Sequence, residues 1–363
     1  MGRKDSDFIF HELTRSICPV CRELIDAQVL LRDNRVYMRK HCPDHGWFEG
    51  LVSSDAQMYV ASAPFNKPGA MPLRFGTQVE RGCPLDCGLC PEHKQHVCSA
   101  LIEVNTGCNL ACPVCFADAG TGFTLTLEEV ERMLDRLLEL VGEPEVVQFS
   151  GGEPTIHPHI LDMVRAAMAR GIPHVMINTN GLRIARDDRF LAELEELRPV
   201  IYLQFDGLES DTYRRIRGED LLDIKLRCLD RLATIDLDVA LVAAMERGIN
   251  EHEVGALVKF GLSHPAVRGI MFQPVTHTGR HLPFNPLERM TIPDVLRGIV
   301  QQTDGLFREK DFVPVPCCFP TCQVNTYLYV NQQQVIPLPR VLPVDQYLDY
   351  ITCLLYTSPS PRD

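Results

Sequence analysis

The sequence lacks an uninterrupted apolar run of about 18 residues, so no segment is expected to span a bilayer. Its opening residues, 1–7, lack the apolar core of a secretory signal peptide, which argues against an oxidising compartment and against disulfides. An excess of positive charge is also missing, because the formal net charge is −12. This balance argues against nucleic acid as a main partner. We therefore expect a cytoplasmic protein.

Cysteine, by contrast, is abundant, and its 15 occurrences are strongly clustered. Thirteen of them fall into local groups: Cys18, Cys21 and Cys42; Cys83, Cys87, Cys90 and Cys98; Cys108, Cys112 and Cys115; and Cys317, Cys318 and Cys322. Clustering of this kind in a reducing compartment favours metal ligation over disulfides. The two others, Cys228 and Cys353, are expected to be ordinary residues.

From Leu101 onward, short β-branched strands alternate with amphipathic helices, which predicts an α/β fold. Strands are expected at 101–104, 145–149, 174–177, 200–205, 238–243 and 269–272, and helices at 127–141, 160–170, 188–197, 221–233 and 251–262. Thr126 and Glu129 form a capping box before the first helix. Each strand is expected to be buried on both faces. The pattern predicts a partial, TIM-like (β/α)6 barrel.

The chain divides into five segments on this interpretation. Residues 1–60 form a small metal-binding module with too little apolar content for its own core, and 61–100 form a Cys-rich segment. The barrel covers 101–300, and a Cys-rich extension covers 301–350. Residues 354–363 have no period or cap, and we interpret them as a non-native tail after a truncation.

The cysteine loop, defined as residues 108–116, brings three thiols together within eight residues. A four-iron cluster normally takes four thiolates, so these three would leave one iron open. Polar groups follow the ends of the other expected strands: 150–154, 178–181, 206–207 and 273–274. The reactive groups of such barrels lie at the carboxyl ends of the strands. The alternative is a closed zinc site with a remote fourth ligand.

The cysteine loop, followed by Gly-Gly-Glu-Pro at 151–154, resembles the radical S-adenosylmethionine (SAM) superfamily. The resemblance implies a [4Fe–4S] cluster on Cys108, Cys112 and Cys115, whose open iron chelates SAM. Reductive cleavage of SAM would then give a 5′-deoxyadenosyl radical that abstracts hydrogen from the substrate.

The resemblance also suggests roles for residues around the cluster. Gly151 and Gly152 would let the backbone approach the cofactor, and Glu153 would pair with the methionine ammonium. Phe116 is expected beside adenine, and Asn178, Thr179 and Asn180 beside the ribose, with Glu246 a weaker candidate for adenine or ribose. Arg217 could meet a carboxylate, but we interpret it as a solvated surface charge.

Further metal sites are expected outside the barrel. Cys18, Cys21, Cys42 and His45 match a tetrahedral zinc site; a rubredoxin-like iron would fit if another thiol replaced His45, and His45 as a plain turn residue is the alternative. Cys83, Cys87, Cys90 and Cys98 suggest a closed auxiliary [4Fe–4S] cluster, with zinc as the competing occupant. Cys317, Cys318 and Cys322 suggest a second auxiliary cluster, in which Cys317 or Cys318 could be a bystander.

The order of these motifs resembles the archaeal tetraether lipid synthases and the class D radical SAM methylases. That resemblance implies C–C bond formation at unactivated carbon, and we first expect lipid tail coupling, with peripheral membrane contact. One alternative is methylation of a pterin precursor, for which Gln204, Asp206 and Gln273 could form an acidic or amide-lined pocket. Another is a peptide-modifying maturase. Each would need an electron donor such as ferredoxin or flavodoxin. A non-enzymatic electron-transfer or zinc-scaffold protein would have no use for Gly151, Gly152 and Glu153.

Overall fold

The computed structural model describes residues 6–66, 71–93, 97–117, 119–120, 122–315, 319–331, 334–342 and 344. Cys317, Cys318, Cys353 and the expected tail at 354–363 lie outside the described residues. Among the described residues, no helix combines the length and the apolar character needed to cross a bilayer.

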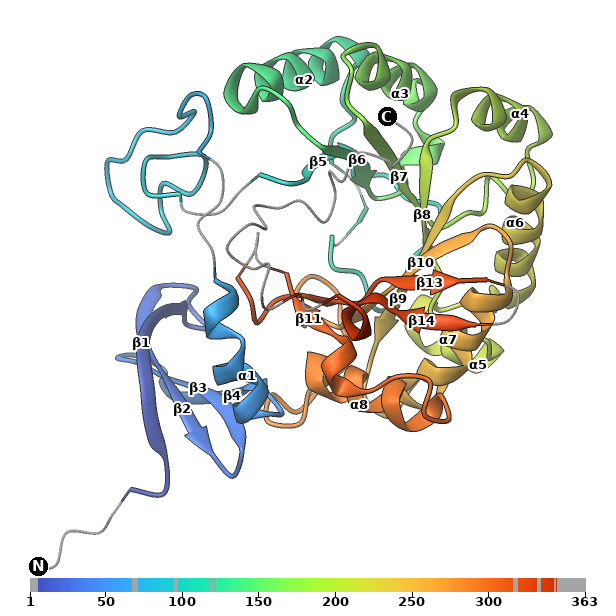
Figure 1. Ribbon diagram of the computed structural model, residues 1–363. Helices are drawn as coiled ribbons and strands as arrows, with labels where there is room; N and C mark the ends of the chain where they lie inside the picture. The colour runs from blue at the N-terminus through green and yellow to red at the C-terminus, as the bar shows by residue number, and fades with distance from the viewer. Residues whose placement is uncertain are drawn as a thin grey trace, which may run out of the picture.

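The N-terminal module is an antiparallel four-stranded sheet with one short helix (Figure 1). Its elements are β1 (Ile9–Ile17), β2 (Leu24–Arg32), β3 (Arg35–Cys42), β4 (Gly46–Ser53) and α1 (Ala56–Ala61). The expectation that it has no core of its own is wrong. Val29, Val36 and Ala56 form a small buried cluster, and Ile25 packs with two of the cysteines in another.

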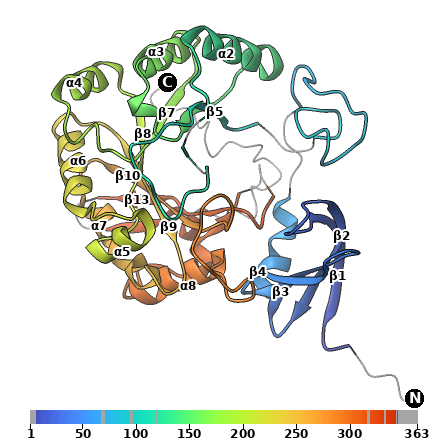
Figure 2. The same cartoon turned by 180° about the vertical axis from the view of Figure 1, so that it is seen from behind.

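Six parallel strands form the second sheet, in the order β10-β9-β8-β7-β6-β5. They are β5 (Ala100–Asn105), β6 (Val146–Gly151), β7 (His174–Thr179), β8 (Val200–Gln204), β9 (Val239–Met245) and β10 (Val267–Pro274). The intervening helices are α2 (Leu127–Val141), α3 (Ile160–Ala169), α4 (Asp188–Leu197), α6 (Leu222–Thr234) and α7 (Val254–Ser263). They surround the outer face of the curved sheet (Figures 1 and 2). The predicted six-stranded partial barrel is confirmed.

We had expected the barrel strands to be buried and apolar on both faces. In the structure, only one face of the sheet is consistently apolar. Ile201 and Leu203 of β8 are fully buried in the main core, whereas Tyr202 and Gln204 line an interior cavity. Strand β6 repeats this alternation, with Phe149 in the core and Gln148 on the cavity side. Because successive side chains of a strand point to opposite faces, the helices cover one face and the other is left for a ligand.

Several elements were not expected from the sequence. They include α5 (Ser210–Arg217) and α8 (Ile292–Gln302), and the short strand pairs β11 (Val313–Pro314) with β12 (Val324–Asn325) and β13 (Leu328–Val330) with β14 (Val335–Pro337). Five 3-10 turns complete the described elements: η1 (Ala63–Phe65), η2 (Pro154–Ile156), η3 (Glu251–Glu253), η4 (Glu309–Asp311) and η5 (Leu338–Arg340). Residues 71–93 and 97–99 are irregular, as predicted. Residues 328–330, which form β13, line the same cavity as residues of β9 and β10.

Candidate active site and metal centres

The cysteine loop follows β5 at the carboxyl edge of the sheet and lines a cavity of about 2280 Å³. Cys112 is buried, and Cys108 and Cys115 are half-buried. Burial raises the pKa of the Cys108 and Cys112 thiols above the usual cysteine value. Iron–sulfur clusters are held by thiolates, so a bound cluster would have to offset this effect. Three soft donors on one loop beside an open cavity fit a cluster with one accessible iron.

Gly151 and Gly152 lie against the backbone of the preceding turn, which explains why this loop needs glycine. Gly151 has φ +131°, a conformation that side chains rarely tolerate, and a Cβ on Gly152 would collide with the carbonyl oxygen of Gly107. The N–H of Gly152 donates to the Asn105 carbonyl at 2.8 Å, and the N–H of Glu153 donates to the Gly107 carbonyl at 2.8 Å. This close approach is to the turn just before the cysteine loop, and the predicted approach of the glycines to the cofactor stays a prediction.

Glu153 also lines the cavity, although only 1% of the residue is exposed. Its Oε1 accepts hydrogen bonds from the Thr155 N–H at 3.0 Å, the Thr155 hydroxyl at 2.6 Å and the Thr179 hydroxyl at 2.7 Å. Its Oε2 accepts one, from the Asn180 N–H at 2.7 Å. The carboxylate therefore links η2 to the end of β7. Oε2 is the oxygen that retains capacity for a further donor, such as an ammonium group.

The three residues predicted beside a ribose follow one another at the end of β7, and all line the cavity. The Asn178 amide donates to the Ser150 hydroxyl at 3.1 Å, and the Asn180 amide donates to Asn109 Oδ1 at 2.7 Å. Thr179 is buried against Glu153. The two asparagine amides and the threonine hydroxyl therefore all have protein partners, and their role beside a ribose stays a prediction.

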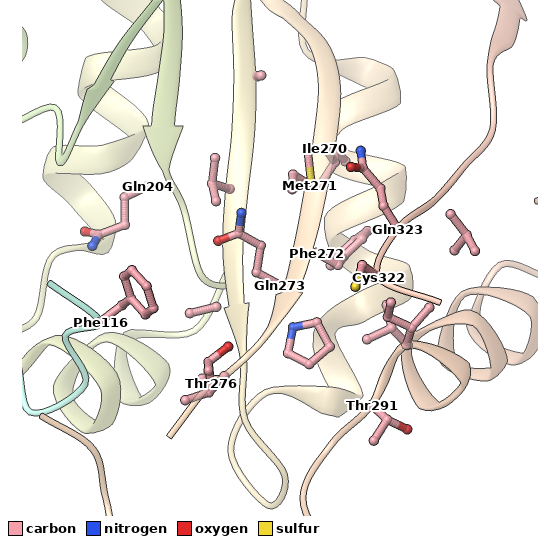
Figure 3. Close-up of a pocket in the computed structure, with 18 of the residues that line it drawn as sticks. Phe116, Gln204, Ile270, Met271, Phe272, Gln273, Thr276, Thr291, Cys322 and Gln323 are labelled. Carbon is pink, nitrogen blue, oxygen red and sulfur yellow. The ribbon is translucent and has the colours of Figure 1, made fainter. Parts of the chain in front are cut away.

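Phe116 and Glu246 are placed very differently from each other. Phe116 lines the cavity, and 73% of the residue is exposed. Its ring is therefore free to stack against a planar ligand. Figure 3 shows it with Gln204, Gln273 and Thr276 around the same pocket. Glu246 instead points to His277, with Oε2 at 3.1 Å from Nε2. Glu246 is not one of the residues that line the cavity, and its expected role at adenine or ribose stays a prediction.

The interpretation of Arg217 as a solvated surface charge is wrong. Its guanidinium is buried, forms two hydrogen bonds with the Asp206 carboxylate, and donates to the Val114 carbonyl inside the cysteine loop at 3.2 Å. Sequence reasoning missed it because the surrounding run of arginines indicated an exposed helix. The signal that could have found it is Asp206, a lone carboxylate at the end of a buried strand.

Arg280 is a second residue that sequence reasoning missed. Its Nε donates to the Cys112 carbonyl at 3.1 Å, and its Nη1 donates to the Ala119 carbonyl at 2.7 Å. Its backbone pairs with Cys115 in both directions, at 2.9 and 3.0 Å. Arg280 therefore holds the cysteine loop from the carboxyl side of β10.

The N-terminal metal centre gathers Cys18, Cys21, Cys42 and His45, whose ligand atoms all lie within 4.8 Å of one another. His45 Nδ1 lies 3.3 Å from Cys42 Sγ and 3.6 Å from Cys18 Sγ. Burial alone would raise the pKa of Cys18, but hydrogen bonds from the Cys21 and Val20 N–H groups bring it to about 6. Three cysteine sulfurs gathered around an imidazole nitrogen fit tetrahedral zinc, with His45 as the fourth ligand.

The remaining cysteines are less closely gathered. Cys83 and Cys87 are exposed, Cys90 is buried, and Cys98 is half-buried. Asp86 shapes their loop, because its Oδ2 accepts hydrogen bonds from the N–H groups of Glu80, Arg81 and Gly82. Cys322 is exposed and lines the main cavity, whereas its two expected neighbours lie outside the described residues. Cys228 is buried in the main core, as expected of an ordinary residue.

Residues 102–261 match the radical SAM superfamily, and residues 10–54 match the HMPTM N-terminal zinc ribbon domain. The chain is also 35% identical to the 7,8-dihydro-6-hydroxymethylpterin dimethyltransferase of Methanocaldococcus jannaschii, over 93% of this chain and 72% of that protein. The chain belongs to the radical SAM superfamily. Membership implies a [4Fe–4S] cluster and SAM as cofactors, and the zinc ribbon agrees with the Cys3His centre.

Two further proteins resemble shorter parts of the chain. The GTP 3′,8-cyclase of Chlorobaculum tepidum is 35% identical over 50% of this chain and 57% of its own length. Among solved structures, SuiB of Streptococcus suis bound to the precursor peptide SuiA is 18% identical, with a TM-score of 0.48, over 57% of this chain and 45% of that chain.

Proposed function

We propose that this radical SAM enzyme methylates a pterin. The support is its 35% identity, over 93% of the chain, to a protein named as a 7,8-dihydro-6-hydroxymethylpterin dimethyltransferase. Lipid tail coupling, which we expected first from the sequence, has no support in the comparisons. The pterin alternative and the radical SAM assignment agree with them.

The observation that carries the proposal is a row of amide side chains across the cavity face of the barrel. Gln148, Asn178, Gln204 and Gln273 come from four different strands and all line the cavity. Gln273 Nε2 donates to the Tyr202 hydroxyl at 3.0 Å, which leaves its Oε1 as an acceptor. A pterin presents alternating donors and acceptors along its ring edge, and amides can match both. Asp206, which we had expected in this pocket, forms an ion pair with Arg217, so its carboxylate is not available to the pterin.

The walls beyond the amide row are mostly apolar. Ile270, Met271 and Phe272 of β10 line one side, and Phe116 adds an exposed ring on the cysteine loop (Figure 3). A planar heterocycle would therefore meet polar groups at its edge and apolar groups at its faces, as ligand pockets usually provide. Such a lining would also keep water from a reactive carbon.

The chemistry divides between the cofactors and the chain. In this superfamily, the cluster and SAM supply the radical that abstracts hydrogen from the substrate, with electrons from a donor such as ferredoxin or flavodoxin. The chain would hold the cluster through Cys108, Cys112 and Cys115. Glu153 Oε2 would accept a hydrogen bond from the methionine ammonium, while Asn178 and Asn180 would orient the nucleoside.

The proposal is tested with full-length protein reconstituted anaerobically with iron, sulfide and zinc. With dithionite, 6-hydroxymethyl-7,8-dihydropterin, SAM as the radical source and a separate one-carbon donor, supplied either as further SAM or as a reduced folate, the wild type should form 5′-deoxyadenosine and a methylated pterin, both detected by mass spectrometry. Cys112→Ala should abolish both products, whereas Cys228→Ala, which removes a buried cysteine of α6, should retain them. SAM cleavage without pterin methylation would reject the pterin and keep the radical assignment. Unchanged cleavage by Cys112→Ala would reject the cysteine loop.

We also propose that Cys83, Cys87, Cys90 and Cys98 bind an auxiliary [4Fe–4S] cluster, and that Cys322 belongs to a second one. If all three cubes form, the reconstituted chain should contain about twelve irons, in addition to one zinc. About four irons per chain would reject the auxiliary clusters and leave the cluster on the cysteine loop unaffected.

A further inference from the structure

A strap, defined as residues 275–291, connects β10 to α8 and carries one more residue of the cavity wall. It is fixed at both ends. Near its start, Arg280 pairs with the backbone of Cys115. Near its end, the Pro286 carbonyl accepts a hydrogen bond from the N–H of Leu51 at 2.8 Å, and the Thr291 hydroxyl lies 2.9 Å from that of Ser54. Arg289 therefore stands on a held segment between the cysteine loop and the zinc ribbon.

Arg289 differs from the other cationic residues that line the cavity. Lys40 donates to the Ser16 hydroxyl and the Ile17 carbonyl. Arg217 is paired with Asp206, and Arg268 with Asp236 and Asp238. His264 lies 3.8 Å from Asp230. Within the described part of the chain, Arg289 has neither an ion pair nor a hydrogen bond.

The surroundings of Arg289 make this lack of a partner costly. Its Nε is buried and has no acceptor within the described residues. Arg289 interacts electrostatically with Glu246 and His277, and Glu246 is already bonded to His277. Burial lowers the pKa of Arg289, and Glu246 only partly opposes that effect. Nε, which is cut off from water, lacks the acceptor that would replace its lost hydration, whereas the residue as a whole is only half-buried and can still be reached by a ligand.

We propose that Arg289 binds an oxyanion on the substrate, namely a phosphate ester on the hydroxymethyl arm of the pterin. The inference rests on the proposed function and deepens it. Nε and one terminal nitrogen of arginine form a fork that matches two oxygens of a phosphate. The cavity, at about 2280 Å³, also exceeds the roughly 300–1,000 Å³ of an ordinary small-molecule site. The cavity is thus large enough to accommodate SAM and the substrate together.

The carboxylate of SAM is the competing source of an oxyanion. Arg217, which lies beside Cys112 of the cysteine loop, is already paired with Asp206, and Arg289 stands on the strap. Separate binding measurements for SAM and for the substrate therefore distinguish the two sources. Loss of Arg289 should affect the substrate, and SAM binding should be unchanged.

The test compares ligand binding by anaerobic, reconstituted full-length protein. Dissociation constants are measured by titration calorimetry for 6-hydroxymethyl-7,8-dihydropterin, for its diphosphate ester and for SAM. Arg289→Met should raise the dissociation constant of the diphosphate ester by about 10- to 100-fold. The dissociation constants of the neutral pterin and of SAM should stay within about threefold of the wild-type values. Arg289→Lys should recover part of the lost affinity for the diphosphate ester. Arg268→Met, which removes a cavity-lining arginine with carboxylate partners, should behave like the wild type.

Three results would overturn the site: an unchanged affinity of Arg289→Met for the diphosphate ester, an equal loss for both pterins, or a loss confined to SAM. Metal content and circular dichroism verify that the variants are folded, and Arg289→Lys serves as the second variant if Arg289→Met is not. If neither pterin binds the wild type, the proposed function fails. Inorganic diphosphate then tests the site separately: binding to the wild type and not to Arg289→Met supports it, and no binding to either rejects it.

Discussion

The guanidinium of Arg217 forms two hydrogen bonds of 2.7 Å with the carboxylate of Asp206, which is completely buried. Asp206 Oδ1 also accepts a hydrogen bond from the Ala244 N–H at 3.0 Å, and Arg217 reaches the Val114 carbonyl. Although burial opposes the charged form, Asp206 raises the pKa of Arg217. One ion pair thus connects α5, the ends of β8 and β9, and the cysteine loop.

Removing one member of this pair should destabilise the fold and release the loop. Arg217→Met leaves the Asp206 charge buried and unpaired, so we expect a loss of about 3–5 kcal/mol in the free energy of unfolding, together with lower iron content. Arg214→Met, on the same helix, breaks an exposed pair with Asp220 and should cost less than about 1 kcal/mol. Urea denaturation and iron analysis measure both. Similar losses for the two variants would contradict the structural role of Arg217.

The glycine pair should be intolerant of a single methyl group. Gly152→Ala would drive its Cβ into the carbonyl oxygens of Gly107 and Thr106, so the turn and the cysteine loop would have to separate. We expect loss of SAM cleavage and reduced iron content. Gly120 is the control position, because a Cβ added there meets nothing within 4 Å. The Gly120→Ala variant should therefore retain activity. Full SAM cleavage by Gly152→Ala would show that this contact is dispensable.

Lys225 should give stability a distinctive dependence on pH. Its Nζ donates to the Asn180 carbonyl at 2.6 Å and to Gln204 Oε1 at 3.0 Å, and burial lowers its pKa to about 8. The unfolded chain, with a lysine pKa of about 10.4, binds more protons above pH 8, so this group adds stability as pH rises from about 8 to about 10. Relative to Lys225→Met, the wild type should gain about 1 kcal/mol between pH 7 and pH 9. A stability difference that stays constant over that range would mean that Lys225 titrates normally.

Local patterns in the sequence were sufficient for most of the barrel. The capping box of Thr126 and Glu129 is present, and α2 has the predicted bounds. Helix α4 also matches its prediction. Helix α5 was missed because it is short and highly charged, with only some of its residues turned inward. A pattern of apolar residues indicates a helix only where packing is apolar, and here an ion pair to Asp206 contributes to the burial.

The sequence by itself determined the superfamily chemistry and the parallel barrel, because the spacing of Cys108, Cys112 and Cys115 and the strand–helix period are local properties of the chain. Only the tertiary structure decided which charges are buried and which side chains share the cavity. Arg217 meets Asp206 eleven positions away, and Arg280 reaches Cys112 across 168 positions. Such pairings depend on how parallel strands bring their ends together, and no local pattern records that geometry.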